Sequence, residues 1–235
     1  MTQFMTKIWD NLVNLFFPNL CVVCGKYGFL LCPDCLCQIE KNVTSTCPEC
    51  GRITVNCRFC PRCRGTYNKH IHAVFVATSY HSVEIKKLIK SLKYQGLTAL
   101  SEVCGELIYQ RIKKMDLPSD LVIVPVPLHH YKYNRRGFNQ SELIARYLSK
   151  RLTVSGADAL VRKKDTKSQA RLPRKERLEN MIDAFQCRDR EFICDKNILL
   201  IDDVLTTGST LNECARILKN SGAKRVYGAV VTRNR

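Results

Sequence analysis

Two adjacent carboxylates followed by a hydroxyl-rich turn are the residues of this sequence best suited to chemistry. Asp202 and Asp203 follow an apolar run at residues 198–201, and the turn at residues 206–210 contains Gly208. Four apolar residues in a row are typical of a buried parallel strand, and the helical pattern after Gly208 places the turn at a helix N-terminus. Backbone N–H groups there favour a phosphate, while carboxylates at the carboxyl end of a strand can accept hydrogen bonds from vicinal sugar hydroxyls. The segment therefore predicts a sugar-phosphate site.

This pattern of thirteen residues, from position 198 to position 210, resembles the fingerprint with which type I phosphoribosyltransferases bind phosphoribosyl pyrophosphate (PRPP). The resemblance implies that the paired acids hold the ribose and that the turn holds the 5′-phosphate. The expected PRPP-binding residues of the motif are Asp202, Asp203, Val204, Leu205, Thr206, Thr207, Gly208, Ser209 and Thr210. The alternative is that the acids only cap the next helix and that the turn is an ordinary one. The sequence has no Walker lysine pattern, which disfavours a P-loop for nucleoside triphosphates.

A cationic loop is predicted between the second strand and the third helix of the chain. It leaves the carboxyl end of a strand and contains Arg135, Arg136 and Gly137. Arginine can bind pyrophosphate oxygens through two parallel hydrogen bonds, and Gly137 permits the turn that presents them, so these three residues complete the expected PRPP site. The expected catalytic residues are Asp202, Asp203 and Arg136. His129 and His130 of the same loop are expected to form an exposed turn rather than a catalytic group, because the sequence supplies no carboxylate to orient them.

The elements that must position these residues alternate along the second half of the chain. Strands are expected at residues 73–77, 121–126, 159–161, 198–201 and 226–231. Helices are expected at residues 84–92, 97–112, 138–152 and 211–220, with a polar helix or loop at 174–185. Such alternation predicts an α/β fold with a mostly parallel sheet of the type I phosphoribosyltransferase type and right-handed crossovers.

A second cationic segment runs from residue 162 to residue 177 and contains few apolar side chains. It could close over a bound phosphoribosyl group, contact a nucleic-acid backbone, or remain a solvated run of charge. The expected nucleic-acid-binding residues are Arg162, Lys167, Arg171, Arg174 and Arg177. Lysine and arginine exceed aspartate and glutamate by 38 − 21 = 17 residues. The surface should therefore attract polyanions, of which nucleic acid is one and PRPP itself another.

Cysteine dominates the first third of the chain, where ten of the fourteen cysteines lie between positions 21 and 63. Eight of them form four C-x-x-C pairs, in which both thiolates can face one tetrahedral zinc ion. The expected zinc ligands are Cys21, Cys24, Cys32, Cys35, Cys47, Cys50, Cys60 and Cys63. The pairs can fill two structural sites in sequential or in interleaved order, and the sequence leaves both orders open. It also leaves open whether Cys57 replaces Cys60 or Cys63 as a ligand. The rival interpretation is the disulfide framework of a secreted domain.

Three parts are therefore expected: an amphipathic helix over residues 1–20, a cysteine-rich zinc-binding module over 21–70 and a phosphoribosyltransferase-like domain over 71–235. No apolar run approaches the about 20 residues that a membrane span needs. The amphipathic helix is interpreted as packing on its own protein. Peripheral contact with a membrane surface, or docking onto a partner, is the alternative.

The chain as a whole resembles the ComF/ComFC competence family over nearly its full length. The residues that support the resemblance, beside the cysteine pairs, are Pro125-Val126-Pro127, Arg136-Gly137-Phe138-Asn139-Gln140, Arg162, Thr166, Gln169, Leu172, Arg177, Asn180, Ala184-Phe185 and the motif at 202–210. The resemblance implies a cytoplasmic protein of DNA uptake and natural transformation that binds PRPP with Mg²⁺, carries structural Zn²⁺ and handles incoming single-stranded DNA. It implies partners such as a ComFA-type helicase and DprA.

Three functions stay open at this point. The first is a phosphoribosyltransferase whose acceptor is unknown. The second is a non-catalytic adaptor with the same fold, which binds single-stranded DNA and competence partners. The third is a nucleobase-salvage phosphoribosyltransferase, which is ranked lowest because a zinc module stands where such enzymes have a base-binding hood.

Overall fold

The computed structural model describes residues 19–41, 44–64, 70–163 and 183–234. All but the last two residues of the helix expected over 1–20 lie outside these ranges. So do four of the expected nucleic-acid-binding residues, Lys167, Arg171, Arg174 and Arg177. In the described residues, no helix combines the length and the apolar character that crossing a bilayer requires.

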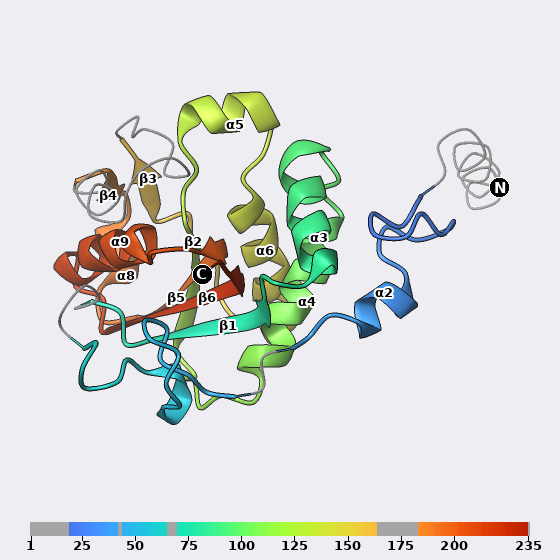
Figure 1. The fold of residues 1–235 in the computed structure, drawn as a ribbon. Coiled ribbons are helices and arrows are strands. Elements are labelled where there is room, and N and C mark those ends of the chain that lie inside the picture. Colours follow the sequence, from blue (N-terminus) through green and yellow to red (C-terminus); the bar gives the residue numbers. More distant parts are fainter. Residues whose placement is uncertain (1–18, 42–43, 65–69, 164–182, 235) are drawn as a thin grey trace.

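A four-stranded parallel sheet lies at the centre of the fold (Figure 1). Its strand order is β1 (Ala73–Ser79), β6 (Arg225–Arg233), β5 (Asn197–Leu205) and β2 (Leu121–Pro125). The four strands are almost continuously buried, as expected for a parallel sheet that is covered on both faces. The expected α/β fold with a mostly parallel sheet is confirmed. Because all pairs are parallel, the four carboxyl ends lie at one edge, where open α/β sheets place their ligands.

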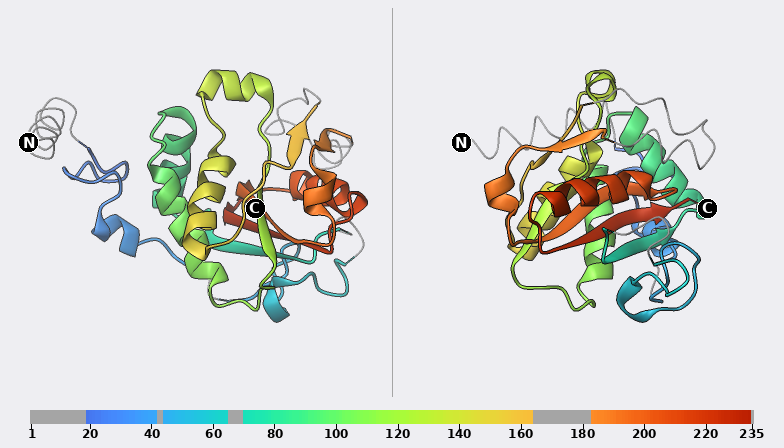
Figure 2. Two further views of the ribbon diagram at one scale, coloured as in Figure 1. Left: turned by 180° about the vertical axis from the view of Figure 1, so that it is seen from behind. Right: turned by 90° about the vertical axis from the view of Figure 1, so that its left-hand side faces the viewer.

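Helices cover both faces of the sheet (Figures 1 and 2). Their bounds are α3 (Val83–Tyr94), α4 (Leu100–Ile112), α6 (Gln140–Leu152) and α9 (Ser209–Asn220). Side chains alternate between faces along a strand. Leu199 and Ile201 of β5 accordingly pack in the cluster that contains α3, α4 and α6, while Ile198 and Leu200 pack in the cluster that contains α9. The apolar run of β5 therefore holds two layers of core together directly before the acid pair.

Three features differ from the sequence-based expectations. A short helix, α5 (His130–Arg136), occupies the expected cationic loop. The strand β3 (Leu160–Arg162) lies outside the main sheet and pairs antiparallel with β4 (Phe185–Cys187), which is followed by the short helix α8 (Arg190–Ile193). The strand β5 continues four residues beyond its apolar run, because β6 is equally long and pairs with it as far as Leu205.

The cysteine-rich segment contacts the edge strand β1 through its second part, whereas its first part lies beside α3 (Figure 1). Its regular elements are the short helix α2 (Pro33–Cys37) and the 3₁₀ turn η1 (Val55–Cys57). Lys41 and Arg58 each form an isolated antiparallel bridge with β1. Covering an edge in this way blocks unwanted strand pairing, so the module protects the sheet as well as holding metal ligands.

Candidate functional site

A cleft with a volume of about 570 Å³ opens at the carboxyl edge of the sheet. Helix α3, the segment after β2, the start of α6 and the end of β5 form its walls. The expected PRPP-binding residues that line it are Asp202, Asp203, Val204, Leu205, Thr206, Gly208, Thr210 and Arg136. The expected residues that do not line it are Thr207, Ser209, Arg135 and Gly137. The structure thus brings the acid pair, the turn and one of the two predicted arginines into one accessible space.

Asp203 is the buried member of the acid pair, with 4% of its surface exposed. Lys93 Nζ lies 2.9 Å from its Oδ1 and 2.8 Å from its Oδ2, and Gln140 Nε2 donates a 2.8 Å hydrogen bond to Oδ2. Burial alone would lower the pKa of Lys93, but the carboxylate of Asp203 outweighs it and raises the pKa above its usual value. Asp203 therefore ties α3 and α6 to the end of β5.

Asp202 is partly exposed at the cleft wall. Its Oδ1 accepts a 3.1 Å hydrogen bond from Ser141 Oγ and a 2.9 Å bond from the backbone N–H of Asp203. Burial, and after it the negative charge of Asp203, raise the pKa of Asp202 to about 7. Asp202 is thus the more accessible of the two acids that line the cleft, and its pKa lies near neutral pH.

Among the described residues, six cationic side chains line the cleft: Lys86, Lys90, Lys93, Lys132, Arg136 and Arg162. Burial, and after it the charges of Arg162, Arg136 and Lys93, lower the pKa of Lys132. The positive potential of the cleft favours an anionic ligand. The sequence-based site omits the three of the four α3 lysines that line the cleft, because a lysine-rich helix face looks like an ordinary solvated surface. Lys93 is 110 positions from Asp203 in the chain, and only the fold brings the two together.

The turn after β5 has the geometry of an anion site. Gly208 has a φ angle of 76° and is the N-cap residue of α9, so it supplies no side-chain cap, and the backbone N–H of Ser209 donates a 3.4 Å hydrogen bond to Thr207 Oγ1. The other N–H groups of the first turn and the helix dipole favour negative charge at this end. Thr207 Oγ1 and Ser209 Oγ lie 2.9 Å apart and hydrogen-bond to each other, so these two hydroxyls brace the turn.

The predicted pyrophosphate loop is partly helical. Gly137 ends α5 in the left-handed conformation, with φ of 80°, as the turn requires. Arg136 Nη1 donates a 3.0 Å hydrogen bond to Gln140 Oε1, which orients the guanidinium within the cleft. The expectation that His129 is exposed is wrong. It is 1% exposed, and its Nδ1 accepts a 3.3 Å hydrogen bond from Tyr131 N because it caps α5.

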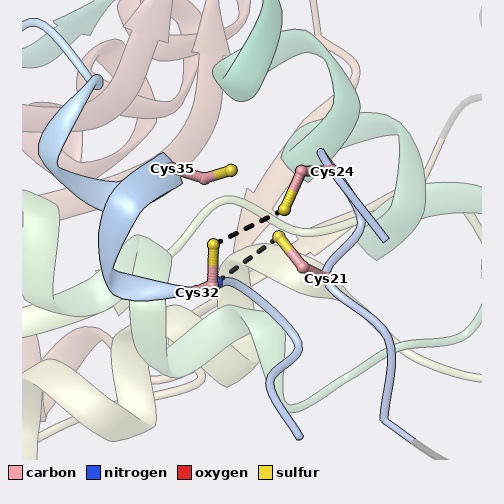
Figure 3. A group of neighbouring side chains, drawn as sticks. All are labelled: Cys21, Cys24, Cys32 and Cys35. Atoms are coloured by element: carbon pink, nitrogen blue, oxygen red, sulfur yellow. Dashed lines mark hydrogen bonds between the residues drawn. The ribbon is translucent and has the colours of Figure 1, made fainter. Parts of the chain in front are cut away.

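The eight paired cysteines form two groups in sequential order. Figure 3 shows the first group, in which four thiols point toward a common centre, and the second group is built alike. The first contains Cys21, Cys24, Cys32 and Cys35, and the second contains Cys47, Cys50, Cys60 and Cys63. Within each group the sulfur atoms lie within 4.8 Å of one another. The interleaved pairing is therefore excluded.

The geometry of both groups fits a zinc ion. Zn–S bonds of about 2.3 Å place the sulfurs of a tetrahedral site about 3.8 Å apart. The Sγ atoms of Cys24 and Cys32 are 3.6 Å apart, and those of Cys50 and Cys60 are 3.5 Å apart. Burial, and then hydrogen bonds with the neighbouring thiols, raise the pKa of Cys35. Four thiolates at such distances would repel one another, and a bound Zn²⁺ would offset that repulsion.

The two extra cysteines of the module lie outside both groups. Cys57 is buried, and its Sγ accepts a 2.9 Å hydrogen bond from Arg111 Nη2. Cys57 thus joins the module to α4 and replaces neither Cys60 nor Cys63. Cys37 is exposed and belongs to neither group of ligands.

The segment of the second cysteine group also contacts the strand ends next to the cleft. The backbone carbonyl of Glu49 accepts a 2.7 Å hydrogen bond from Arg233 Nη2, at the end of β6. Next to it, Asn234 N donates a 2.9 Å bond to the carbonyl of Leu205, at the end of β5. The metal module therefore supports the strand ends that form the floor of the cleft.

Comparison with known proteins agrees with this architecture. Residues 96–235 match the phosphoribosyl transferase domain. Competence protein F of Haemophilus influenzae is 29% identical over 229 residues, which covers 90% of this chain and 95% of that protein. The chain belongs to the phosphoribosyl transferase domain family and is similar to competence proteins over most of its length. DNA utilization protein YhgH of Escherichia coli K12 is 29% identical over 226 residues, covering 90% of this chain and 96% of that protein. Competence protein ComFC of Streptococcus pneumoniae is 27% identical over 198 residues, which covers 83% of this chain and 84% of that protein.

Proposed function

We propose that the cleft binds PRPP together with Mg²⁺ and that the protein acts in the cytoplasm on single-stranded DNA taken up by the cell. The observation that carries the PRPP proposal is the convergence of a reachable carboxylate, six cations and the N-terminus of α9 in one cleft. A sugar phosphate that bears a pyrophosphate has the matching groups. The DNA proposal draws on the names of the relatives, which include a DNA utilization protein and two competence proteins.

Each part of the ligand has a matching wall in the cleft. The turn at residues 206–210 would hold the 5′-phosphate, where N–H groups and the helix dipole favour an anion. Asp202 would accept hydrogen bonds from the ribose hydroxyls, while Asp203 holds Lys93 in place. Arg136 and Lys132 would bind the pyrophosphate. Magnesium would be held chiefly by substrate oxygens and water, since it keeps several waters in most protein sites.

Transfer from this position needs little covalent chemistry from the protein. A nucleophile attacks the anomeric carbon of the ribose, the bond to the pyrophosphate oxygen breaks, and pyrophosphate leaves with the electron pair. Bound Mg²⁺ supplies part of the charge neutralisation. Arg136 and Lys132 stabilise the departing anion, and Asp202 fixes the ribose so that the acceptor approaches in line.

Calorimetric titration of PRPP with Mg²⁺ into the zinc-loaded full chain tests the binding proposal. The Asp202→Asn/Asp203→Asn variant is expected to lose binding. Asp195→Asn is the matched control, because Asp195 is exposed and lies outside the cleft, and asparagine tolerates its positive φ of 57°. Equal affinity of the double variant and the control would refute the proposed role of the acid pair.

A non-catalytic adaptor is the second candidate. It is favoured by the contacts of Asp203, which already bonds to Lys93 and Gln140 and so forms a stable network without substrate. Pyrophosphate release, measured with bases, amines and single-stranded DNA as acceptors, separates the two functions. Release with one acceptor supports the transferase, and release with a free base supports nucleobase salvage. Tight PRPP binding with no release supports the adaptor, whose proposed partners include a ComFA-type helicase and DprA.

A further inference from the structure

A second cationic pocket, with a volume of about 420 Å³, lies at the amino edge of the sheet. The basic residues that line it include Arg58, Arg64, His72, Lys219, Lys224 and Arg225. No aspartate or glutamate is among its lining residues in the described chain. This edge is opposite to the one that carries the PRPP cleft. Because β6 has nine residues at about 3.3 Å each, the two sites lie on the order of 25–30 Å apart.

Rigid elements hold this second pocket in place. Arg58 belongs to the segment that bridges to β1, and Arg64 directly follows the zinc ligand Cys63. Arg225 is the first residue of β6. The backbone N–H of His72 donates a 2.7 Å hydrogen bond to the carbonyl of Val226, and its ring packs edge-on against Tyr227 with centroids 5.2 Å apart. Zinc module and sheet therefore build the pocket jointly.

The arginines of the second cationic pocket, Arg58, Arg64 and Arg225, form no ion pairs with acids in the described residues. Burial, and then the charges of Arg58, Arg225 and Arg64, lower the pKa of His72. Lys219 has a local role, since its Nζ donates 2.9 Å bonds to two carbonyls after the end of α9. The other cations repel one another, and a bound polyanion would relieve that repulsion.

A smaller neighbouring pocket of about 250 Å³ continues this space. The two pockets share Arg58, His72 and Arg225, and the smaller one extends to Asn56 and Pro118, with Asp116 as its one acidic lining residue among the described residues. The shape is therefore a groove rather than a closed pocket for a small molecule. No exposed aromatic side chain lines either pocket in the described residues, so contacts to phosphates rather than base stacking are favoured.

We propose that this groove at the amino edge of the sheet binds the phosphate backbone of a single-stranded nucleic acid. The inference rests on the proposed DNA handling but not on PRPP binding. It assigns the binding of the nucleic-acid strand to residues of the groove rather than to the cationic segment at 162–177. Because the groove and the cleft lie at opposite edges of the sheet, strand and sugar phosphate can be bound at the same time.

The test is fluorescence anisotropy of a labelled oligothymidylate over a range of salt concentrations, with the zinc-loaded full chain. The groove variant is Arg58→Gln/Arg64→Gln/Arg225→Gln. The matched control, Lys150→Gln/Arg188→Gln/Arg190→Gln, removes three exposed cations that line neither pocket. Each phosphate contact contributes about 0.7 to the slope of log affinity against log salt, so loss of three contacts should make the slope shallower by about 2. The affinity at low salt should fall at least about tenfold, and the control should match the wild type.

Three results would overturn the inference. The first is a salt slope of the groove variant that equals that of the wild type. The second is a loss of oligonucleotide affinity in the control that equals the loss in the groove variant. The third is that the wild-type groove binds inorganic pyrophosphate but not the oligonucleotide. The last would assign the groove to a small phosphorylated ligand. Calorimetry with PRPP and Mg²⁺ on the groove variant should give the wild-type affinity. If the groove proposal is refuted, the proposal of PRPP binding still stands. If PRPP does not bind, the salt dependence of oligonucleotide binding still tests the groove.

Discussion

Ionisation of Asp202 should control ligand affinity across neutral pH. Its pKa of about 7 arises from burial and from the neighbouring charge of Asp203. The carboxylate form accepts the hydrogen bonds of ribose hydroxyls, and the protonated form competes poorly for them. About one-tenth of the protein carries the carboxylate at pH 6 and about nine-tenths at pH 8. PRPP with Mg²⁺ should therefore bind roughly tenfold more tightly at pH 8 than at pH 6, and about half a proton should be released per ligand at pH 7.

Calorimetry in two buffers with different ionisation enthalpies measures both the affinity and the proton release. The phosphate groups of the ligand also titrate, with a second pKa of about 6, so the wild type alone does not isolate the protein group. Asp202→Asn is the control, because it keeps the ligand titration and removes the carboxyl. We expect weaker binding in this variant and a smaller change in affinity between the two pH values. Identical pH dependence in the wild type and the variant would refute the reasoning.

Three further predictions concern stability and metal content. The pKa of Asp202 is higher in the folded protein than in the unfolded chain, so its stabilising contribution is complete below about pH 4 and lost by about pH 7. Asp202→Asn should therefore raise the melting temperature at pH 8 and leave it unchanged at pH 4, as measured by circular dichroism. Lys93→Met leaves Asp203 buried without its cation and should lower the free energy of unfolding by about 3 kcal/mol in urea, with partial recovery in Lys93→Met/Asp203→Asn. Cys47→Ser should remove one of two zinc ions by elemental analysis, whereas Cys37→Ser should keep both.

Local sequence patterns were sufficient to predict the elements that carry the motif. The apolar run at 198–201 and the glycine before the helix predicted the strand and α9, because burial and a left-handed turn restrict residue type strongly. Gly137 likewise predicted the turn at the end of α5. The C-x-x-C pairs predicted which cysteines come together in the fold, since two thiols on one turn can face the same centre.

Contacts between distant parts of the chain could not be predicted in the same way. Nothing near Lys93 in the sequence indicates a buried ion pair with Asp203, because the pair forms only when α3 packs beside β5. The burial of His129 depends on its role as the cap of α5, which was not recognised as a helix. The order of cysteine pairing depends on chain path rather than on spacing. The cationic groove depends on three segments that meet only at the amino edge of the sheet.

A crystal structure of the full chain with PRPP and Mg²⁺ tests the central claim most directly. The account predicts the 5′-phosphate at the N-terminus of α9, the ribose hydroxyls within hydrogen-bond distance of Asp202, and the pyrophosphate beside Arg136. Electron density for the ligand in another pocket, or with the pyrophosphate at the turn and the 5′-phosphate beside Arg136, would contradict it.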